Sequence, residues 1–232
     1  VEIAAEMAYY SNKFFKRGNF SCDNLKISLI SSSSSILPGL KQDLINISQK
    51  RLKDLGINVI TGIKLQEVGD GYCKFSNGTT IQHSFVIFTG GIEASTISSE
   101  LEVASNSRGQ IIVNEFMQTD KYENIFAVGD IAEIKNSKGE IMPPNVTIAR
   151  ISGANAGINV LRLMDGRPLI KCNPKLDGIL IALGGKFAAG DIYGLLTVKG
   201  RLAYEIKKYV FSSYRRPLLK LIKKGYAKLK RL

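Results

Sequence analysis

The heptapeptide Asn124-Ile125-Phe126-Ala127-Val128-Gly129-Asp130 carries the clearest sign of the fold. Its apolar residues from Ile125 to Val128 predict a buried strand, and the Gly-Asp pair predicts a turn at the carboxyl end of that strand. A short strand at 110–113 precedes it, and Pro143-Pro144 followed by small and apolar residues predicts a helix from about Asn145 to Met164. This order of elements is typical of an α/β protein.

The N-terminal third has the same alternation of helix and strand. Periodicity predicts a helix from residue 1 to about 16, a break at Gly18-Asn19, a strand at 25–30, a helix at 40–55 and a strand at 57–60. This is the order of a parallel α/β unit whose first strand would precede Val1. We therefore expect the fold to be N-terminally truncated.

The next stretch predicts hairpins and then a second buried strand. Short alternating segments are separated by Asp70-Gly71 and Asn77-Gly78, which are hairpin-turn pairs; the segments are 63–68, 72–75 and 79–82. Ser84 to Phe88 is almost entirely apolar, as in a strand covered on both faces, and it ends at Thr89-Gly90-Gly91. A further strand is predicted from Gly178 to Leu183.

Cysteine and histidine usage argues against metal and nucleophile chemistry. Cys22, Cys73 and Cys172 form no Cys-x-x-Cys pair, which disfavours a zinc site or a local redox disulfide. His83 is the sole histidine, so a Ser-His-Asp triad is disfavoured, and a surface or strand-end position is expected for it.

The positive charge is concentrated at the C-terminus. Of the formal net charge of +12, residues 199–232 hold twelve Lys and Arg against the single acid Glu205. Apolar residues alternate with them at helical spacing before and after Pro217, which predicts two amphipathic helices lying on an anionic membrane surface. A partner protein or nucleic acid is the alternative, and the regular apolar residues speak against nucleic acid. The residues expected at the membrane are Leu202, Ile206, Tyr209, Leu218, Lys220, Leu221, Ile222, Lys224 and Leu229, with Ala203 and Val210 on the same face as Leu202 and with Lys207 and Lys208 opposite.

Several of these stretches, in order, resemble the two-dinucleotide-domain flavoprotein reductases, and most closely their type II NADH:quinone oxidoreductase branch. Val1-Glu2-Ile3-Ala4-Ala5-Glu6 is similar to the segment after that family's first Gly-rich turn of the NADH domain. The strand ending at Gly90-Gly91, the second flavin signature at 124–130 and the proline-bounded helix follow in the family's order. The resemblance implies a Rossmann-like, three-layer α/β fold.

The resemblance also implies where NADH would bind. It places Glu2 near the nicotinamide and places Gly90 and Gly91 where a side chain would block the cofactor. Ser31 occupies the strand end that normally carries the acidic partner of the ribose 2′-OH. With no Lys or Arg between Ser31 and Lys41 to bind a 2′-phosphate, NADH is favoured over NADPH. Without the family context, Glu2 is an ordinary helix-start acid and the glycine pair is a turn.

For FAD, the resemblance implies a site at the end of the second signature. Asp130 would bind the ribityl chain, Gly129 would allow close approach, and the helix start at Ile148 and Ala149 would face the flavin ring. The family's quinone-site glutamines are replaced here by Thr147 and Ile151, and Arg150 is a candidate substitute. The flavin would carry the chemistry, so no catalytic side chain is expected. A strand-to-loop turn beside a tightly packed helix is the structural alternative.

These features define the domains and the function expected of them. We expect an NADH domain at 1–105, part of an FAD domain at 106–170 and a membrane-anchoring region at 171–232. The implied activity is electron transfer from NADH through FAD to a quinone, at the cytoplasmic face of the cell membrane; a homodimer is compatible with it. The alternatives are a protein like sulfide:quinone oxidoreductase and an inactive fragment that binds no cofactor.

Overall fold

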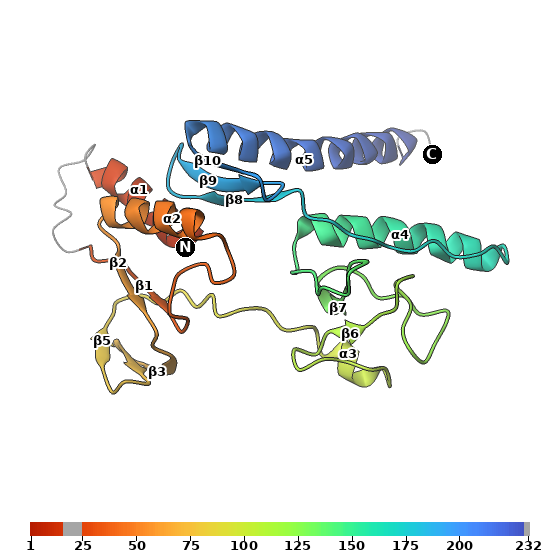
Figure 1. Ribbon diagram of the computed structural model, residues 1–232, viewed down its shortest axis with the longest axis horizontal. Helices are drawn as coiled ribbons and strands as arrows, with labels where there is room; N and C mark the ends of the chain where they lie inside the picture. The colour runs from red at the N-terminus through yellow and green to blue at the C-terminus, as the bar shows by residue number, and fades with distance from the viewer. Residues whose placement is uncertain (16–24, 230–232) are drawn as a thin grey trace. The chain divides into compact units, whose positions relative to one another are not determined.

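The chain forms two compact units. The computed structural model describes residues 1–15 and 25–229 (Figure 1). Val1–Val86 and Asp177–Leu232 together form the first unit, which we call unit 1, and Ile87–Leu176 form unit 2. The predicted break at Gly18-Asn19 lies outside the described residues. The functional domains predicted at 1–105, 106–170 and 171–232 remain a prediction.

Unit 1 begins with the predicted alternation of helices and strands. The elements are α1 (Glu2–Phe15), β1 (Ser28–Ser31), α2 (Gln42–Asp54) and β2 (Asn58–Thr61). β1 and β2 pair in parallel, which confirms the predicted α/β unit. The helices bury small and branched side chains in one cluster, because their apolar residues recur at helical spacing. The buried members of this cluster are Ala5, Ala8, Ile36, Ile45, Leu52 and Ile57.

The predicted hairpins form a small antiparallel sheet in unit 1. It contains β3 (Leu65–Gly69), β4 (Tyr72–Phe75) and β5 (Thr80–Gln82) in sequential order. Gly71 and Gly78 have φ values of +75° and +80°, the left-handed conformation that both turns require. The hairpin prediction is therefore confirmed.

A second antiparallel sheet lies in the C-terminal part of unit 1. It contains β8 (Gly178–Ala182), β9 (Ala188–Ile192) and β10 (Leu196–Gly200), of which only the first was predicted. β8 contacts α1, and β9 and β10 contact α2. Leu44 of α2 packs with Ile181, Leu183 and Ala189 in a shared buried cluster. The C-terminal sheet is thus part of the same core as the N-terminal helices.

The last element of unit 1 is the long helix α5 (Arg201–Leu229), which runs along the C-terminal sheet (Figure 1). The predicted division at Pro217 was wrong, because the helix continues through this residue. Proline removes one helical hydrogen bond, but the Leu, Lys and Arg residues around it are strong helix formers. Among the described residues, no helix has both the length and the apolar character needed to cross a bilayer.

The N-terminal part of α5 faces the sheet differently from the prediction. Ala203 is fully buried with Ala188 and Val198, and Ile206 packs against the same cluster. Leu202 and Tyr209, predicted to share their face, are exposed. The predicted single apolar face is therefore divided between the sheet and the surface, because the sheet covers only part of it.

Unit 2 is built around one helix and very short strands. Its elements are α3 (Ile97–Glu100), β6 (Ile111–Ile112), the 3₁₀ turn η1 (Gly129–Ile131), β7 (Ala132–Glu133) and α4 (Val146–Met164). β6 and β7 pair in parallel. The core lies between these strands and α4, and its buried members are Ile111, Val113, Met117, Ala127, Ala132, Ile134, Ile148, Ala156 and Cys172.

Two predicted strands do not pair with neighbouring strands to form a sheet. Residues 84–88 have no strand partner among the described residues, and Phe85 and Phe88 are exposed. Phe126 makes only an isolated bridge to Gln118. Both predictions were wrong in this structure. An apolar run becomes a buried strand only if neighbouring strands pair with it, and periodicity does not report on neighbours.

Three asparagines organise the loops of unit 2 in the same way. The side-chain oxygen of each accepts hydrogen bonds from the backbone N–H groups two and four residues later; the asparagines are Asn106, Asn114 and Asn136. The third residue after each is left-handed, with φ of +72° at Gly109, +70° at Met117 and +79° at Gly139. These Asx-type turns hold long loops in defined conformations.

Candidate functional site

Gly129 and Asp130 lie against the first turns of α4. The Gly129 N–H donates to Ser152 Oγ at 3.1 Å, and the Ser152 hydroxyl donates to the Ile148 carbonyl at 2.8 Å. Gly129 has a φ of +69°, and a Cβ built on it would lie 3.4 Å from Ala149 Cβ. Both the left-handed backbone and the close helix favour glycine here. The carboxylate of the next residue, Asp130, is exposed.

The start of α4 is capped by Asn145. Its Oδ1 accepts the Ile148 N–H at 3.0 Å, and its backbone oxygen accepts the Ala149 N–H at 2.9 Å. The Ile148 side chain is only 2% exposed and belongs to the core of unit 2. The cap fixes where the positive end of the helix dipole lies, next to the Gly129–Asp130 turn. Such an end favours a negatively charged or electron-rich ligand.

A buried polar network supports the backbone of Asp130 from behind. Gln110 Nε2 donates to the Asp130 carbonyl at 3.0 Å, and Asn106 Nδ2 donates to Gln110 Oε1 at 3.1 Å. Asn106 Nδ2 also donates to Glu133 Oε2 at 2.9 Å. This bond and the Lys135 ammonium lower the pKa of Glu133 against the opposing effect of its burial. Sequence reasoning missed this network, although the Asn106-x-x-Gly109-Gln110 spacing is a turn signal.

The three quinone candidates follow the Asn145 cap along the first turns of α4. Thr147 is half-buried and Arg150 is exposed. Ile151 packs against the core of unit 2. The structure therefore places all three on the helix whose first turns contact Gly129, with different degrees of access.

Glu2 is tied to the C-terminal sheet and to α5. Its Oε1 accepts the Ala182 N–H at 2.6 Å and the Lys207 Nζ at 2.7 Å. Lys207 Nζ also donates to the Leu180 carbonyl at 2.8 Å. The prediction that Lys207 lies on the outward polar face was wrong, because the sheet side of α5 offers it a carboxylate and a carbonyl. Glu6 makes a parallel contact, accepting the Gly185 N–H at 3.0 Å.

The other predicted NADH residues lie in both units. Ser31 ends β1 in unit 1, and its hydroxyl oxygen accepts the Ser33 N–H at 3.3 Å. Gly90 and Gly91 lie in unit 2. Gly91 has a φ of +130°, and a Cβ on Gly90 would lie 2.3 Å from the Phe88 ring. The left-handed backbone favours glycine at position 91, whereas the contact at Gly90 is with the far end of the exposed Phe88 ring, which can turn aside.

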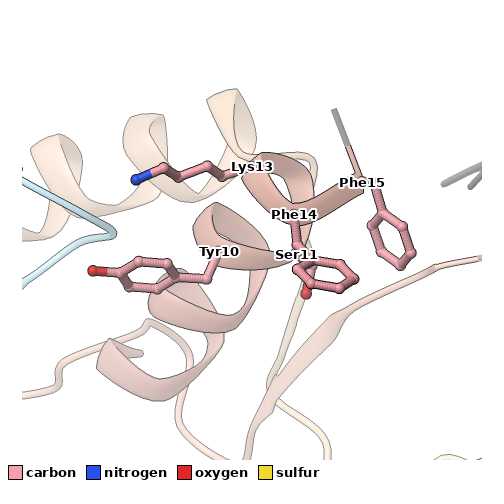
Figure 2. A pocket seen from close by; sticks show the side chains of 5 residues that line it. All are labelled: Tyr10, Ser11, Lys13, Phe14 and Phe15. Atoms are coloured by element: carbon pink, nitrogen blue, oxygen red, sulfur yellow. The ribbon is translucent and has the colours of Figure 1, made fainter. Parts of the chain in front are cut away.

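One hollow of unit 1 is lined by none of these residues. Figure 2 shows it at the C-terminal end of α1, lined by Tyr10, Ser11, Lys13, Phe14 and Phe15, with a cavity volume of about 520 Å³. Glu2 is at the opposite end of the same helix. Residues 16–24, which follow this end of α1, are outside the described residues. The hollow therefore supports no assignment.

A glycine-acid turn against the N-terminus of a helix, in a chain that also contains a parallel α/β unit, is an arrangement of nucleotide-binding proteins. The comparisons with known proteins define the class further. Residues 2–154 match the pyridine nucleotide-disulphide oxidoreductase family. The chain belongs to this family.

Individual relatives agree with that membership. A type II NADH:quinone oxidoreductase of Haemophilus influenzae is 27% identical over 213 residues, which cover 88% of this chain and 48% of that protein. The fold is similar to that of NDH2 from Plasmodium falciparum in complex with RYL-552, with a TM-score of 0.75 and 17% identity over 91% of this chain and 59% of that one. It is also similar to a sulfide:quinone oxidoreductase from Aquifex aeolicus, with a TM-score of 0.70 and 18% identity over 92% and 53%. The chain spans about half the length of the relatives that it matches over most of its sequence.

Proposed function

We propose that the protein transfers electrons from NADH through FAD to a quinone. The observation that carries this proposal is the Gly129–Asp130 turn held against the capped start of α4, in a chain of this oxidoreductase family. The relatives named as type II NADH:quinone oxidoreductases support the choice of donor and acceptor. When bound, the flavin would supply the redox chemistry, accepting a hydride and passing on two electrons.

The residues of unit 2 would bind and orient the flavin. The Asp130 carboxylate is exposed and would accept a hydrogen bond from a ribityl hydroxyl. Gly129, which carries no side chain, would let the ligand approach the backbone. The start of α4 at Ile148 and Ala149 would lie beside the flavin. The Ile148 side chain is buried in the core, so its contribution there would come from the helix backbone, whose dipole favours the electron-rich edge of the reduced ring. The network through Gln110 would hold Asp130 in place.

Nicotinamide and quinone would be bound by the remaining predicted residues. Glu2 would lie near the nicotinamide, and Ser31 would donate its hydroxyl proton to the ribose, since its oxygen already accepts a backbone N–H. Gly90 and Gly91 would leave room for the cofactor. For the quinone we propose contacts with Thr147, Arg150 and Ile151.

We further propose that α5 holds the protein on the cytoplasmic face of the cell membrane. Leu202, Tyr209, Leu218 and Ile222 are exposed apolar side chains on this helix, and Lys220 is exposed beside them. Each Lys or Arg near an anionic surface contributes about 1 kcal/mol at low screening. The predicted contacts of Leu221, Lys224 and Leu229 concern side chains outside those described. Homodimer formation remains a prediction.

Sulfide:quinone oxidoreductase chemistry is the alternative, and it requires reactive cysteines. Cys73 and Cys172 are both buried, and burial raises the pKa of the Cys172 thiol. A raised pKa disfavours the thiolate that redox chemistry uses. Among the described residues, the cysteines thus favour the NADH-dependent activity.

Steady-state assays of the natural full-length protein test this choice. We expect quinone reduction with NADH as donor, weaker reduction with NADPH and none with sulfide. The result that would overturn the proposal is turnover with sulfide alone. Sedimentation with anionic vesicles tests the membrane contact. Leu218→Asp is expected to lower vesicle binding about tenfold, because it replaces an exposed apolar side chain that would enter the lipid with a negative charge.

A further inference from the structure

The turn between β9 and β10 presents large apolar side chains to the surface. We call residues 193–196 the hairpin tip. Leu195 is 89% exposed, the highest value among the large apolar side chains described, and Tyr193 and Leu196 are 67% and 58% exposed. Three exposed apolar residues at one turn form a patch that is uncommon on a free surface and that points to an interaction.

The hairpin tip is a defined turn. The Leu195 N–H donates to the Ile192 carbonyl at 3.0 Å, and the Tyr193 N–H donates to the Asp177 carbonyl at 2.7 Å. Lys41, which precedes α2, donates to the Gly194 carbonyl and, at 3.2 Å, to Asp191 Oδ1. Tyr193 itself has a φ of +54°, an uncommon conformation for a non-glycine residue. These bonds fix the backbone of the hairpin tip, on which the three apolar side chains are exposed.

The hairpin tip lies at the end of the C-terminal sheet over which α5 passes. β10 has five residues and spans about 16 Å, and α5 returns in contact with β8, β9 and β10. A helix rises about 1.5 Å per residue, so α5 needs about eleven residues to cover the length of β10. Counted from Arg201, α5 reaches the end of the sheet near Phe211. Phe211, Leu218 and Ile222 are exposed, so the exposed apolar residues of α5 continue beyond the end of the sheet.

The charge around this end of unit 1 favours a lipid surface as the occupant. From Phe211 onward, where α5 reaches this end of the sheet, the sequence holds eight Lys and Arg and no acid. Exposed leucines and aromatic residues beside such charge suit the boundary between acyl chains and anionic headgroups, where a tyrosine can keep its hydroxyl wet. A phosphate-binding surface for nucleic acid would use the charge but not the leucines.

We propose that the hairpin tip inserts Tyr193, Leu195 and Leu196 into an anionic bilayer beside α5. The inference rests on the membrane contact proposed above and extends it to a second element. A single amphipathic helix can roll about its axis on a membrane. A second contact, on a sheet that packs against α1 and α2, would set one orientation of unit 1 toward the lipid.

A tryptophan reporter tests the insertion. The chain contains no tryptophan, so Leu195→Trp adds a distinct signal. With vesicles of phosphatidylglycerol and phosphatidylcholine, we expect its emission to shift to the blue and to be quenched by brominated acyl chains. Val68→Trp, on the exposed face of β3 in the same unit, is the matched control and is expected to show neither change.

Sedimentation with the same vesicles separates this inference from the membrane contact of α5. We expect Leu195→Asp to weaken binding about tenfold with an unchanged melting temperature, because Leu195 is exposed. If Leu218→Asp releases the protein from vesicles while the tryptophan of the Leu195→Trp variant stays unquenched, the proposed insertion of the hairpin tip is overturned. The proposed membrane contact of α5 is then supported. If the unaltered protein binds no vesicles, both fail. A blue shift that depends on protein concentration without vesicles would overturn the proposal in favour of self-association.

Discussion

Asp130→Ala protein is expected to retain little flavin after purification. The exposed carboxylate of Asp130 is the group proposed to accept a hydroxyl of the cofactor, and a hydrogen bond to a charged group contributes roughly 1.5–3 kcal/mol. Its loss corresponds to a rise of about ten- to a hundredfold in the flavin dissociation constant. The ratio of visible flavin absorbance to protein absorbance, followed by titration with added FAD, measures the effect.

A second acid of unit 2 provides the control. Asp165 follows α4, is exposed and pairs with the exposed Arg167. Asp165→Ala removes a carboxylate from the far end of the same helix and should leave flavin retention unchanged. Both variants should melt like the parent, because neither carboxylate is buried. Full flavin occupancy in Asp130→Ala protein would contradict the assignment of the site.

Gly184→Val is expected to destabilise unit 1 by roughly 3 kcal/mol. Gly184 has a φ of +91°, and its added Cβ would lie 2.9 Å from the Ala5 carbonyl oxygen and 3.2 Å from the Leu55 side chain. The substitution combines a left-handed backbone for a branched residue with overlap against the backbone of α1. Denaturant unfolding followed by circular dichroism measures the loss, and limited proteolysis shows whether the C-terminal sheet is released.

Gly62→Val is the matched control in the same unit. Gly62 has a φ of +78°, and nothing lies within 4 Å of its added Cβ. It therefore has the backbone strain without the overlap, and roughly 1 kcal/mol of destabilisation is expected. Equal losses in the two variants would show that close packing of the C-terminal sheet on α1 contributes little.

Local patterns predicted the elements whose signals are local. The helical spacing before Phe15, the parallel pair β1 and β2, and the hairpins around Gly71 and Gly78 all follow from nearby residues. β9 and β10 were missed, although the alternation from Leu196 to Gly200 and the glycine at 194 are signals of the same kind. Their small and glycine residues weaken the apolar pattern that marks most strands.

The candidate site was predictable only in its ligand-facing part. Gly129, Asp130 and the start of α4 stand out in the sequence, and the structure brings them together. The support through Gln110 and Asn106 depends on side chains that meet across loops, so sequence spacing alone did not link it to Asp130. The contact of Lys207 with Glu2 joins residues 205 positions apart and leaves no local trace.

The sequence by itself determined the order of helices and strands near the N-terminus, the turns that require glycine, and the concentration of positive charge from Lys199 onward. Each of these depends on the conformational preferences or charges of adjacent residues. Only the tertiary structure decided which face of α5 the C-terminal sheet covers, that apolar residues 84–88 form no strand, and that the hairpin tip is exposed. Those outcomes depend on which distant segments pair and pack, and an apolar residue carries the same local signal whichever partner covers it.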